Sequence, residues 1–474
     1  MLLANDPHRG VANPSLRYIV HLSAPGYSVI GATEPAIPGV AIGHNGNVGW
    51  GLTIVGTDQA DVFMEQLNPD DPNQALWQGE WYTLETVVDT IPVLGQEPEI
   101  VTYQFSRNGP IFHVDEENDV AYAIRATSSE PGGGGYLGAL RLAEVDDCNE
   151  FVDALEYYHA PDENMICGDV EGNIAWVAAA LTPRRTGEDW YGRLPVPGTG
   201  EYAWDGFLMP RELPYEINPE RGWIATANHD VQPEGYRPPI MFKGSTSSRW
   251  SRLQQMFADL KADLTADDFE DMQHDMVFPW FADDDLPLFT GWTSQDTEVE
   301  WARTQLSGWD GKYHRISPAA ALHYHWRDVI DERAWEPGVS LGERRQLSED
   351  ALEQAVATMK DTQGEDRRQW RWGRINEVEF PHTFVAAYDI PSAERSGDAG
   401  TVFDVGATYR EIIDFSNFDN SRGTSTPGQS MQPGSPFYDN LLPLWVDQEY
   451  FPLLYTRPAV EAETAYRLEL RPGE

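Results

Sequence analysis

The chain has 474 residues, which is long enough to bury a sizeable core without cross-links. Its formal net charge is −44, with 77 acidic residues against 33 Lys and Arg, so its surface repels nucleic acid and anionic membranes. Acidity spread along the whole sequence favours a halophilic protein, because high salt screens the self-repulsion. No stretch of the sequence is apolar for long enough to predict a membrane span, and no compartment is indicated.

The first part of the chain predicts short strands, because its apolar or alternating runs are punctuated by Gly and Pro. These strands are expected at residues 18–22, 39–43, 62–67 and 102–105. Four glycines at 132–135 predict a hinge or a loop of close approach, and the apolar spacing after them predicts a helix over 137–158. A second β segment is expected at residues 165–176 and 222–228.

The middle of the chain is mainly helical in its pattern of apolar residues, with helices expected at 250–272, 319–334 and 348–359. Strands and loops rich in Pro and Gly return from about residue 398. Because no repeat or linker marks a boundary, we predict one α+β unit, β-rich over 1–250 and 398–474 and mainly helical over 250–397. Strands near both ends suit an architecture in which late strands complete an early sheet.

Neither the cysteines nor the acidic runs predict a metal or catalytic site by themselves. Cys148 and Cys167 allow at most one disulfide and exclude a metal site built from several cysteines. The acidic run at 283–285, together with Glu298 and Glu300, is interpreted as solvated surface, because acids are abundant throughout the chain.

Three segments combine Gly with Asn or His in turn contexts that folding alone does not require. They are Leu-Leu-Ala-Asn-Asp-Pro-His at 2–8, the Gly-rich stretch 38–53 running into Asp-Gln-Ala-Asp at 58–61, and Arg-Leu-Pro-Val-Pro-Gly-Thr-Gly at 193–200, followed by Gly-Trp-Ile-Ala-Thr-Ala-Asn at 222–228. In this order and spacing the chain resembles the β-subunit of the penicillin acylase (penicillin amidase) family. The resemblance covers essentially the whole chain, including residues 161–185, Gln-His-Asp at 273–275 and Tyr-Asp-Asn-Leu-Leu-Pro-Leu-Trp at 438–445.

This resemblance implies a fold and a nucleophile. The fold is the α+β αββα sandwich of the N-terminal-nucleophile hydrolases, here with a helical insertion. The family's nucleophile is a Ser exposed by self-cleavage, whose own α-amine acts as general base, so no Ser-His-Asp triad is needed. That Ser is expected upstream of Met1. Ser15 and Ser23 are internal and lie on the wrong side of the motif to replace it.

Four residues match the family's machinery around the nucleophile. The side chain of Asn228 and the backbone N–H of Ile54 are implied as the two donors to the tetrahedral oxyanion. Arg249 is implied to orient substrate and Asn228, and His8 to lie close to the nucleophile. On local grounds each has a plainer interpretation: Asn228 as a turn residue, Ile54 as a buried strand residue, Arg249 as a surface group at a helix start and His8 as a turn residue.

A structural calcium site is also implied, with the carboxylates of Asp58 and Asp61 and the carbonyl of Ala60 as oxygen ligands. Gly192 falls where another carbonyl ligand is expected, and one further ligand belongs to a different subunit. The plainer interpretation is two solvated acids in an acidic chain.

The function implied is hydrolysis of linear amides, namely the side-chain amides of β-lactams, a step in antibiotic metabolism, or N-acyl-homoserine lactones. The implied partner is an α-subunit from the same precursor that walls the acyl pocket. One alternative is a truncated, inactive remnant or binding module with the same fold. A carbohydrate-active protein is a weaker alternative, because it needs two carboxylates facing each other across a cleft.

Overall fold

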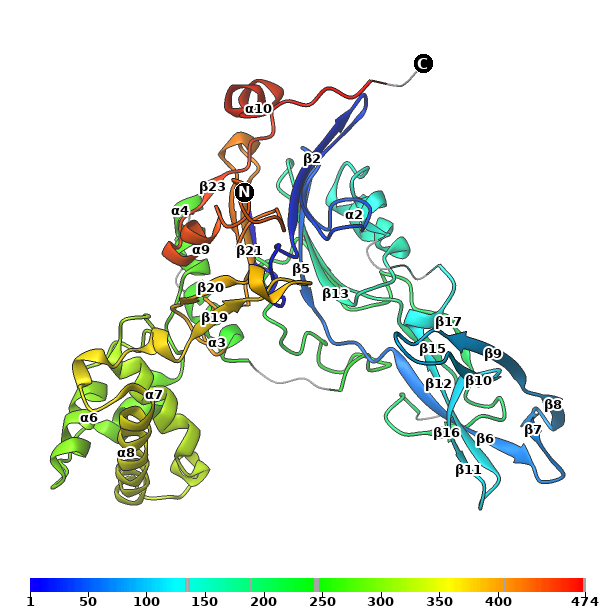
Figure 1. Cartoon of the computed structure of the whole chain (residues 1–474), viewed down its shortest axis with the longest axis horizontal. Helices are drawn as coiled ribbons and strands as arrows, with labels where there is room; N and C mark the ends of the chain where they lie inside the picture. The colour runs from blue at the N-terminus through cyan, green and yellow to red at the C-terminus, as the bar shows by residue number, and fades with distance from the viewer. Residues whose placement is uncertain are drawn as a thin grey trace.

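A computed structural model describes residues 1–132, 134, 137–187, 190–242, 247–258, 260–261, 263–404 and 406–471. Two β-sheets face each other at the centre of the molecule, with a helical lobe on one side and a long β-sheet arm on the other (Figure 1). This arrangement confirms the predicted α+β class and its helical insertion. No helix among the described residues is both long and apolar enough to span a membrane.

The larger central sheet is antiparallel and is built from the first half of the chain. Its strands, in spatial order, are β18 (Tyr215–Ile217), β14 (Ile174–Ala179), β13 (Glu163–Asp169), β5 (Val48–Ile54), β4 (Ile42–His44), β3 (Tyr27–Thr33) and β2 (Tyr18–Ala24). On β5 large and small residues alternate, so its two faces differ. Trp50 and Leu52 pack in one core with Phe151 of helix α2 (Cys148–Ala154), which follows the short helix α1 (Ala139–Leu142).

The smaller sheet joins the two ends of the chain. Its order is β1 (Leu2–Asn5), β21 (Tyr409–Asp414), β22 (Arg422–Ser425) and β23 (Phe451–Pro452). It approaches the glycine face of β5 closely, since a Cβ on Gly51 would lie 2.8 Å from the Cβ of Asn5. Asn5 Nδ2 also donates to the Leu52 carbonyl at 2.9 Å. The late strands β21 to β23 therefore pair with β1 in a separate sheet and add no strand to the larger one, so the predicted completion of an early sheet by late strands holds only for β1.

Helices cover the outer faces of both sheets, which gives the αββα layering. Helix α2 contacts β13 and β14 of the larger sheet, and helix α4 (Ala266–Gln273) contacts β1 and β21 of the smaller one. Helix α3 (Ser248–Ala258) precedes α4, and α9 (Leu442–Asp447) and α10 (Arg457–Glu463) lie near the C-terminal end.

The arm and the lobe diverge from this centre, the lobe toward the lower left and the arm toward the lower right of the view (Figure 1). The arm has the order β8 (Glu80–Thr83), β7 (Asp71–Trp77), β6 (Ala60–Asn68), β12 (Val120–Ala126), β11 (Gly109–Asp115), β10 (Glu99–Ser106) and β9 (Glu85–Ile91), and β16 (Val196–Pro197) pairs with β6. A hairpin of β15 (Pro183–Arg185) and β17 (Trp204–Phe207) lies beside it. The lobe contains α5 (Leu286–Phe289), α6 (Thr297–Ser307), α7 (Pro318–Val329) and α8 (Leu341–Gln363), and a second hairpin joins β19 (Glu377–Phe380) to β20 (Ile390–Glu394).

Most predicted elements exist, although several have different limits. The helices predicted at 319–334 and 348–359 correspond to α7 and α8, and 165–176 forms the β13–β14 hairpin. The helices predicted at 137–158 and 250–272 are each divided in two. The strand predicted at 222–228 is wrong, because this segment turns at Gly222 and at Asn228, whose φ values are 74° and 56°. Gly133 and Gly135 of the predicted hinge lie outside the described residues.

The interpretation of residues 283–285 as solvated surface is wrong for Asp285. A π-helical turn over Phe281–Asp285 leaves Asp283 and Asp284 exposed but directs Asp285 inward, where its side chain is fully buried. Its carboxylate contacts His323 Nε2 at 2.9 Å and accepts from Arg327 at 2.7 Å. Burial of this carboxylate is offset by these two partners, so it holds the lobe together rather than facing solvent.

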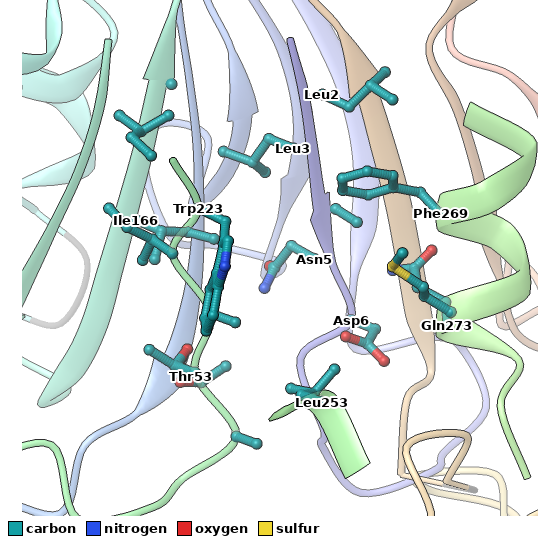
Figure 2. Close-up of a pocket in the computed structure, with 18 of the residues that line it drawn as sticks. Leu2, Leu3, Asn5, Asp6, Thr53, Ile166, Trp223, Leu253, Phe269 and Gln273 are labelled. Carbon is teal, nitrogen blue, oxygen red and sulfur yellow. Dashed lines mark hydrogen bonds between the residues drawn. The ribbon is translucent and has the colours of Figure 1, made fainter. Parts of the chain in front are cut away.

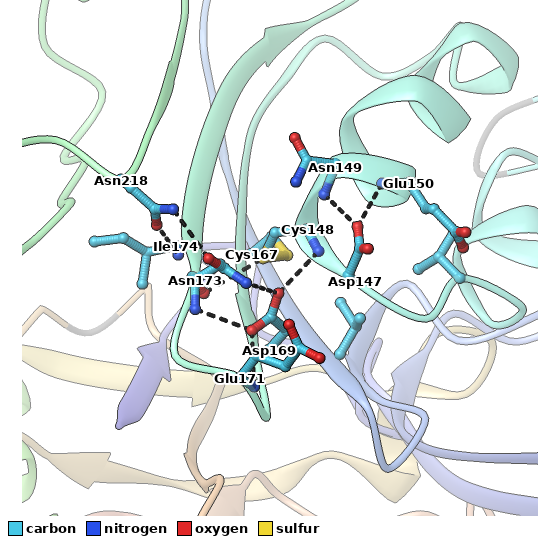
Figure 3. The surroundings of a disulfide bond; sticks show 12 residues. Asp147, Cys148, Asn149, Glu150, Cys167, Asp169, Glu171, Asn173, Ile174 and Asn218 are labelled. Atoms are coloured by element: carbon cyan, nitrogen blue, oxygen red, sulfur yellow. Dashed lines mark hydrogen bonds between the residues drawn. A yellow bond between two sulfur atoms is a disulfide. The ribbon is translucent and has the colours of Figure 1, made fainter.

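The two cysteines form one disulfide between α2 and β13 (Figure 3). Their Cα atoms are 5.9 Å apart. Beside the disulfide, the Asp169 carboxylate accepts from the backbone N–H groups of Cys148 at 3.2 Å and Asn173 at 2.9 Å. The helix layer is thus fastened to the centre of the larger sheet by one covalent bond and by hydrogen bonds.

Candidate active site

A cavity of about 980 Å³ lies between β1, β13 and helices α3 and α4. Figure 2 shows Leu3, Ile166 and Trp223 directed into the space between β1 and β13, with Phe269 and Gln273 reaching in from α4. Most of the wall is apolar. The polar groups gather toward the loop after β1 and the end of β5, and the four residues predicted for catalysis all line the cavity: His8, Ile54, Asn228 and Arg249.

Asn228 and Ile54 are in direct contact. The Asn228 side-chain amide donates from Nδ2 to the Ile54 carbonyl at 2.7 Å. Arg249 donates from Nη2 to Asn228 Oδ1 at 3.0 Å, which fixes the amide with its nitrogen toward β5. The left-handed backbone at Asn228 is one that Asn tolerates better than most residues, which gives a local reason for Asn at this turn.

The direction of the Ile54 N–H follows from the ladder between β5 and β13. The N–H of Val55 donates to the Asp162 carbonyl at 3.3 Å. In an antiparallel ladder successive residues face opposite edges, so the N–H and C=O of Ile54 both point away from β13. Because that C=O accepts from Asn228, the Ile54 N–H lies on the same edge as the Asn228 amide.

A second group of polar residues supports Arg249 from the smaller sheet. Arg249 Nη1 lies 3.4 Å from His8 Nδ1, which is 3.3 Å from a carboxylate oxygen of Asp404. Burial opposes ionisation of Asp404, yet the hydrogen bonds from His8 and from the N–H of Gly406 hold its pKa below the ordinary value. Burial raises the pKa of Asp6, which lines the same end of the cavity, despite the nearby positive charges. Asp404 and Asp6 were not predicted as site residues.

Asn164 joins the strand that carries Ile54 to the rest of the larger sheet. It is fully buried, accepts from Trp176 Nε1 at 2.9 Å, and donates to Thr53 Oγ1 and to the Ile54 carbonyl, each at 3.3 Å. The Thr53 hydroxyl lies 2.9 Å from that of Thr226, two residues before Asn228. Sequence reasoning missed Asn164, although an amide next to the apolar run Met165–Cys167 is the kind of signal that could have found it.

The family model described as penicillin amidase matches residues 1–462. This chain belongs to the penicillin amidase family. Its similarity to individual relatives is modest but extends over nearly all its length. The acyl-homoserine lactone acylase QuiP of Pseudomonas fluorescens (strain Pf0-1) is 26% identical over 541 residues, covering 95% of this chain and 63% of the relative.

Two penicillin acylases are also similar. The penicillin acylase 2 proenzyme of Pseudomonas sp. (strain SE83) is 27% identical over 525 residues, covering 100% of this chain and 67% of the proenzyme. The penicillin G acylase of Escherichia coli is 30% identical over 318 residues, covering 65% of this chain and 37% of that protein. This penicillin amidase chain therefore spans about two thirds of the length of those relatives that match nearly all of it.

Among solved structures, the thermostable penicillin G acylase from Alcaligenes faecalis superposes with a TM-score of 0.74 at 21% identity, covering 100% of this chain and 97% of that one. The likeness confirms the predicted fold, that of an N-terminal-nucleophile hydrolase.

The residues predicted to bind calcium lie away from this cavity, where β6 begins. Asp58 and Asp61 are both ion-paired with Arg185, at 3.4 and 2.8 Å. Gly192 is also at this position, since a Cβ placed on it would lie 2.7 Å from Asp58 Oδ2. The structure thus brings the predicted ligands together, but around a guanidinium group. They do not fit a calcium ion.

Proposed function

We propose that this penicillin amidase cleaves linear amides by transferring the acyl group to an N-terminal Ser and then to water. One observation carries the proposal: the Asn228 amide and the Ile54 N–H share one edge of β5, at the polar end of an apolar cavity. Two fixed N–H donors side by side are what the oxyanion of a tetrahedral intermediate requires.

The donors are available as well as adjacent. An Asn amide has two N–H groups, and the bond to the Ile54 carbonyl uses one of them, which leaves the other for the substrate oxygen. Arg249 holds the Asn228 oxygen, and the carboxylate of Asp404, which accepts from His8, places a negative charge near Arg249. In this proposal Asn228 and Ile54 stabilise the oxyanion, whereas Arg249 and His8 position them.

The nucleophile is proposed to come from a segment upstream of Met1 that pairs with the free edge of β1. The N–H of Phe415 donates to the Met1 carbonyl, so by the alternation of the ladder Leu2 and Ala4 direct their backbone groups away from β21. Both residues line the cavity, as does Ile166 on the facing sheet. A strand added there would cover this apolar surface and bring its end close to Asn228.

Neither internal serine noted in the sequence suits the role. Ser15 is buried against Ser425, with 3.3 Å between their hydroxyl oxygens, and Ser23 lies in the exposed part of β2. Neither lines the cavity. These positions support a nucleophile from outside the described residues.

The substrate class follows from the walls of the cavity and from the relatives. Apolar side chains from β13, α3 and α4 suit an acyl group, and the polar end suits the amide and its leaving group. The matched relatives are named acyl-homoserine lactone acylase and penicillin acylase, so the proposed substrates are acyl-homoserine lactones and β-lactams with an amide side chain. Because one relative is a proenzyme, we propose an α-subunit from the same precursor as partner.

The test is to express the gene with its upstream region in high salt and to determine the N-terminus of the mature chain by mass spectrometry. A new N-terminal Ser, a separate α-chain and release of acyl groups from amides are expected. In that protein Asn228→Ala should lower kcat by about 10²- to 10³-fold, whereas Asn118→Ala, on an exposed turn of the arm, should not change it. A chain that starts at Met1 and hydrolyses no amide would instead support an inactive remnant or binding module.

A further inference from the structure

Arg185 occupies the place where the family resemblance predicts a calcium ion. The side chain comes from the end of β15, is only 5% exposed and reaches the start of β6. There it meets the carboxylates of Asp58 and Asp61, which belong to the loop after β5 and to β6. The guanidinium group therefore connects the end of β15 to residues 58–61, which lie far from it in the sequence.

Asp61 has little capacity left for a metal ion. Its side chain is fully buried, and Arg185 Nε contacts both carboxylate oxygens, at 2.8 and 3.1 Å. The indole N–H of Trp204 donates to one of the same oxygens at 2.6 Å. Charge-assisted bonds of this kind are the stronger ones in proteins, and these leave the carboxylate neutralised and hydrogen-bonded in place.

Asp58 and Gly192 complete the enclosure. The carbonyl of Asp58 accepts from Arg185 Nη2 at 3.0 Å, and the N–H of Ala60 bonds to the Asp58 carboxylate. A Cβ on Gly192, whose φ is 96°, would lie 2.7 Å from Arg185 Cζ. Only a residue without a side chain leaves room here for the guanidinium group.

A calcium ion needs a different set of partners. It takes about six to eight oxygen ligands, at roughly 2.3–2.6 Å, and much of its binding energy comes from several carboxylates. Among the described residues no group of three or more His, Cys, Asp or Glu is gathered in a way that could hold a metal ion. A divalent cation placed between Asp58 and Asp61 would also be repelled by the charge of Arg185.

We propose that Arg185 is the resident cation at this position, and that the fold of this chain does not depend on calcium there. The guanidinium group binds Asp58, which lies in the segment that connects the end of β5 at Ile54 to the arm. Loss of this tie would therefore loosen the segment that leaves the candidate oxyanion strand. The inference rests on the ion pairs alone and does not depend on the proposed enzymatic function.

The test is thermal unfolding of the full chain in concentrated KCl, with EDTA, with excess calcium chloride or with the same concentration of magnesium chloride. Magnesium and the high salt control for non-specific screening of the acidic surface. The unfolding midpoint of the wild type is expected to be the same in all three solutions. Arg185→Met is expected to lower it by several degrees, because it leaves a buried carboxylate without its charged partner.

Arg184→Met is the matched control. Arg184 is the preceding residue, 42% exposed and paired with the equally exposed Glu212, so its loss should change the midpoint little. The proposal is overturned if calcium, but not magnesium, raises the wild-type midpoint and Asp58→Asn abolishes that increase. It is also overturned if Arg185→Met unfolds at the wild-type temperature. These wild-type and Asp58→Asn measurements decide the question even if Arg185→Met does not fold.

Discussion

Glu163 should make the stability of this chain depend on pH in the weakly acidic range. Its side chain is fully buried on β13, opposite Ile54, with Arg9 at 2.9 Å. Burial is the main influence and raises the pKa from 4.5 to about 7, although Arg9 opposes the shift. The folded state therefore binds a proton that the unfolded state releases between these two values.

The contribution of Glu163 is fully present below pH 4.5 and is lost as the pH rises through about 7. At about 1.4 kcal/mol per pKa unit, the shift corresponds to about 3 kcal/mol of unfolding free energy. Glu163→Gln keeps the shape of the side chain and removes its titration, so the variant should lack this part of the pH dependence.

The assay is guanidinium-induced unfolding of wild type and Glu163→Gln at a series of pH values, in constant high salt. The difference between the two should change by about 3 kcal/mol between pH 4 and pH 8, with wild type losing stability relative to the variant as pH rises. Glu353→Gln, on the exposed face of α8, should follow the wild-type curve. Parallel curves for wild type and Glu163→Gln would refute the reasoning.

Two further predictions concern the larger sheet. Asn164→Ala in the processed, active enzyme should lower kcat about tenfold or more with little change in KM, because Thr53 and the Ile54 carbonyl lose their anchor. Steady-state kinetics at several substrate concentrations would show this, and an unchanged kcat would exclude a positioning role. Replacing Cys148 and Cys167 by Ser should lower the free energy of unfolding by about 3 kcal/mol, since the disulfide closes a loop with a sequence separation of 19. Denaturant unfolding would measure this loss, and a reducing agent should destabilise only the wild type.

The sequence patterns predicted those features that depend on local alternation and spacing. The Gly-Trp-Gly-Leu run of β5, which has one bulky and one bare face, is not among the strands predicted above, although its bare face is where the smaller sheet approaches. The helices α7 and α8 follow the apolar spacing of their own segments. The four residues assigned through the family motifs line one cavity, and their catalytic roles stay proposals.

Features decided by distant partners could not be predicted in this way. Asp404 contacts His8 only because the last part of the chain returns to the first strand. Asp285 looks like its acidic neighbours in sequence, and only the π-helical turn separates it from solvent. Either Arg185 or a calcium ion could neutralise the carboxylates of Asp58 and Asp61. Which cation lies there depends on the position of β15, which carries Arg185.

The smaller sheet combines the first strand of the chain with three strands from its last part, which sets the order in which strands pair during synthesis. Strands β2 to β5, β13, β14 and β18 of the larger sheet all lie within residues 18–217, so they can pair before the rest of the chain has left the ribosome. Strand β1 has to wait for β21, which begins at Tyr409. Until then its apolar side chains are without their partner strand, and any segment directly upstream of Met1 would be its nearest available neighbour. The edge of β1 that faces the cavity can thus be occupied before the opposite edge.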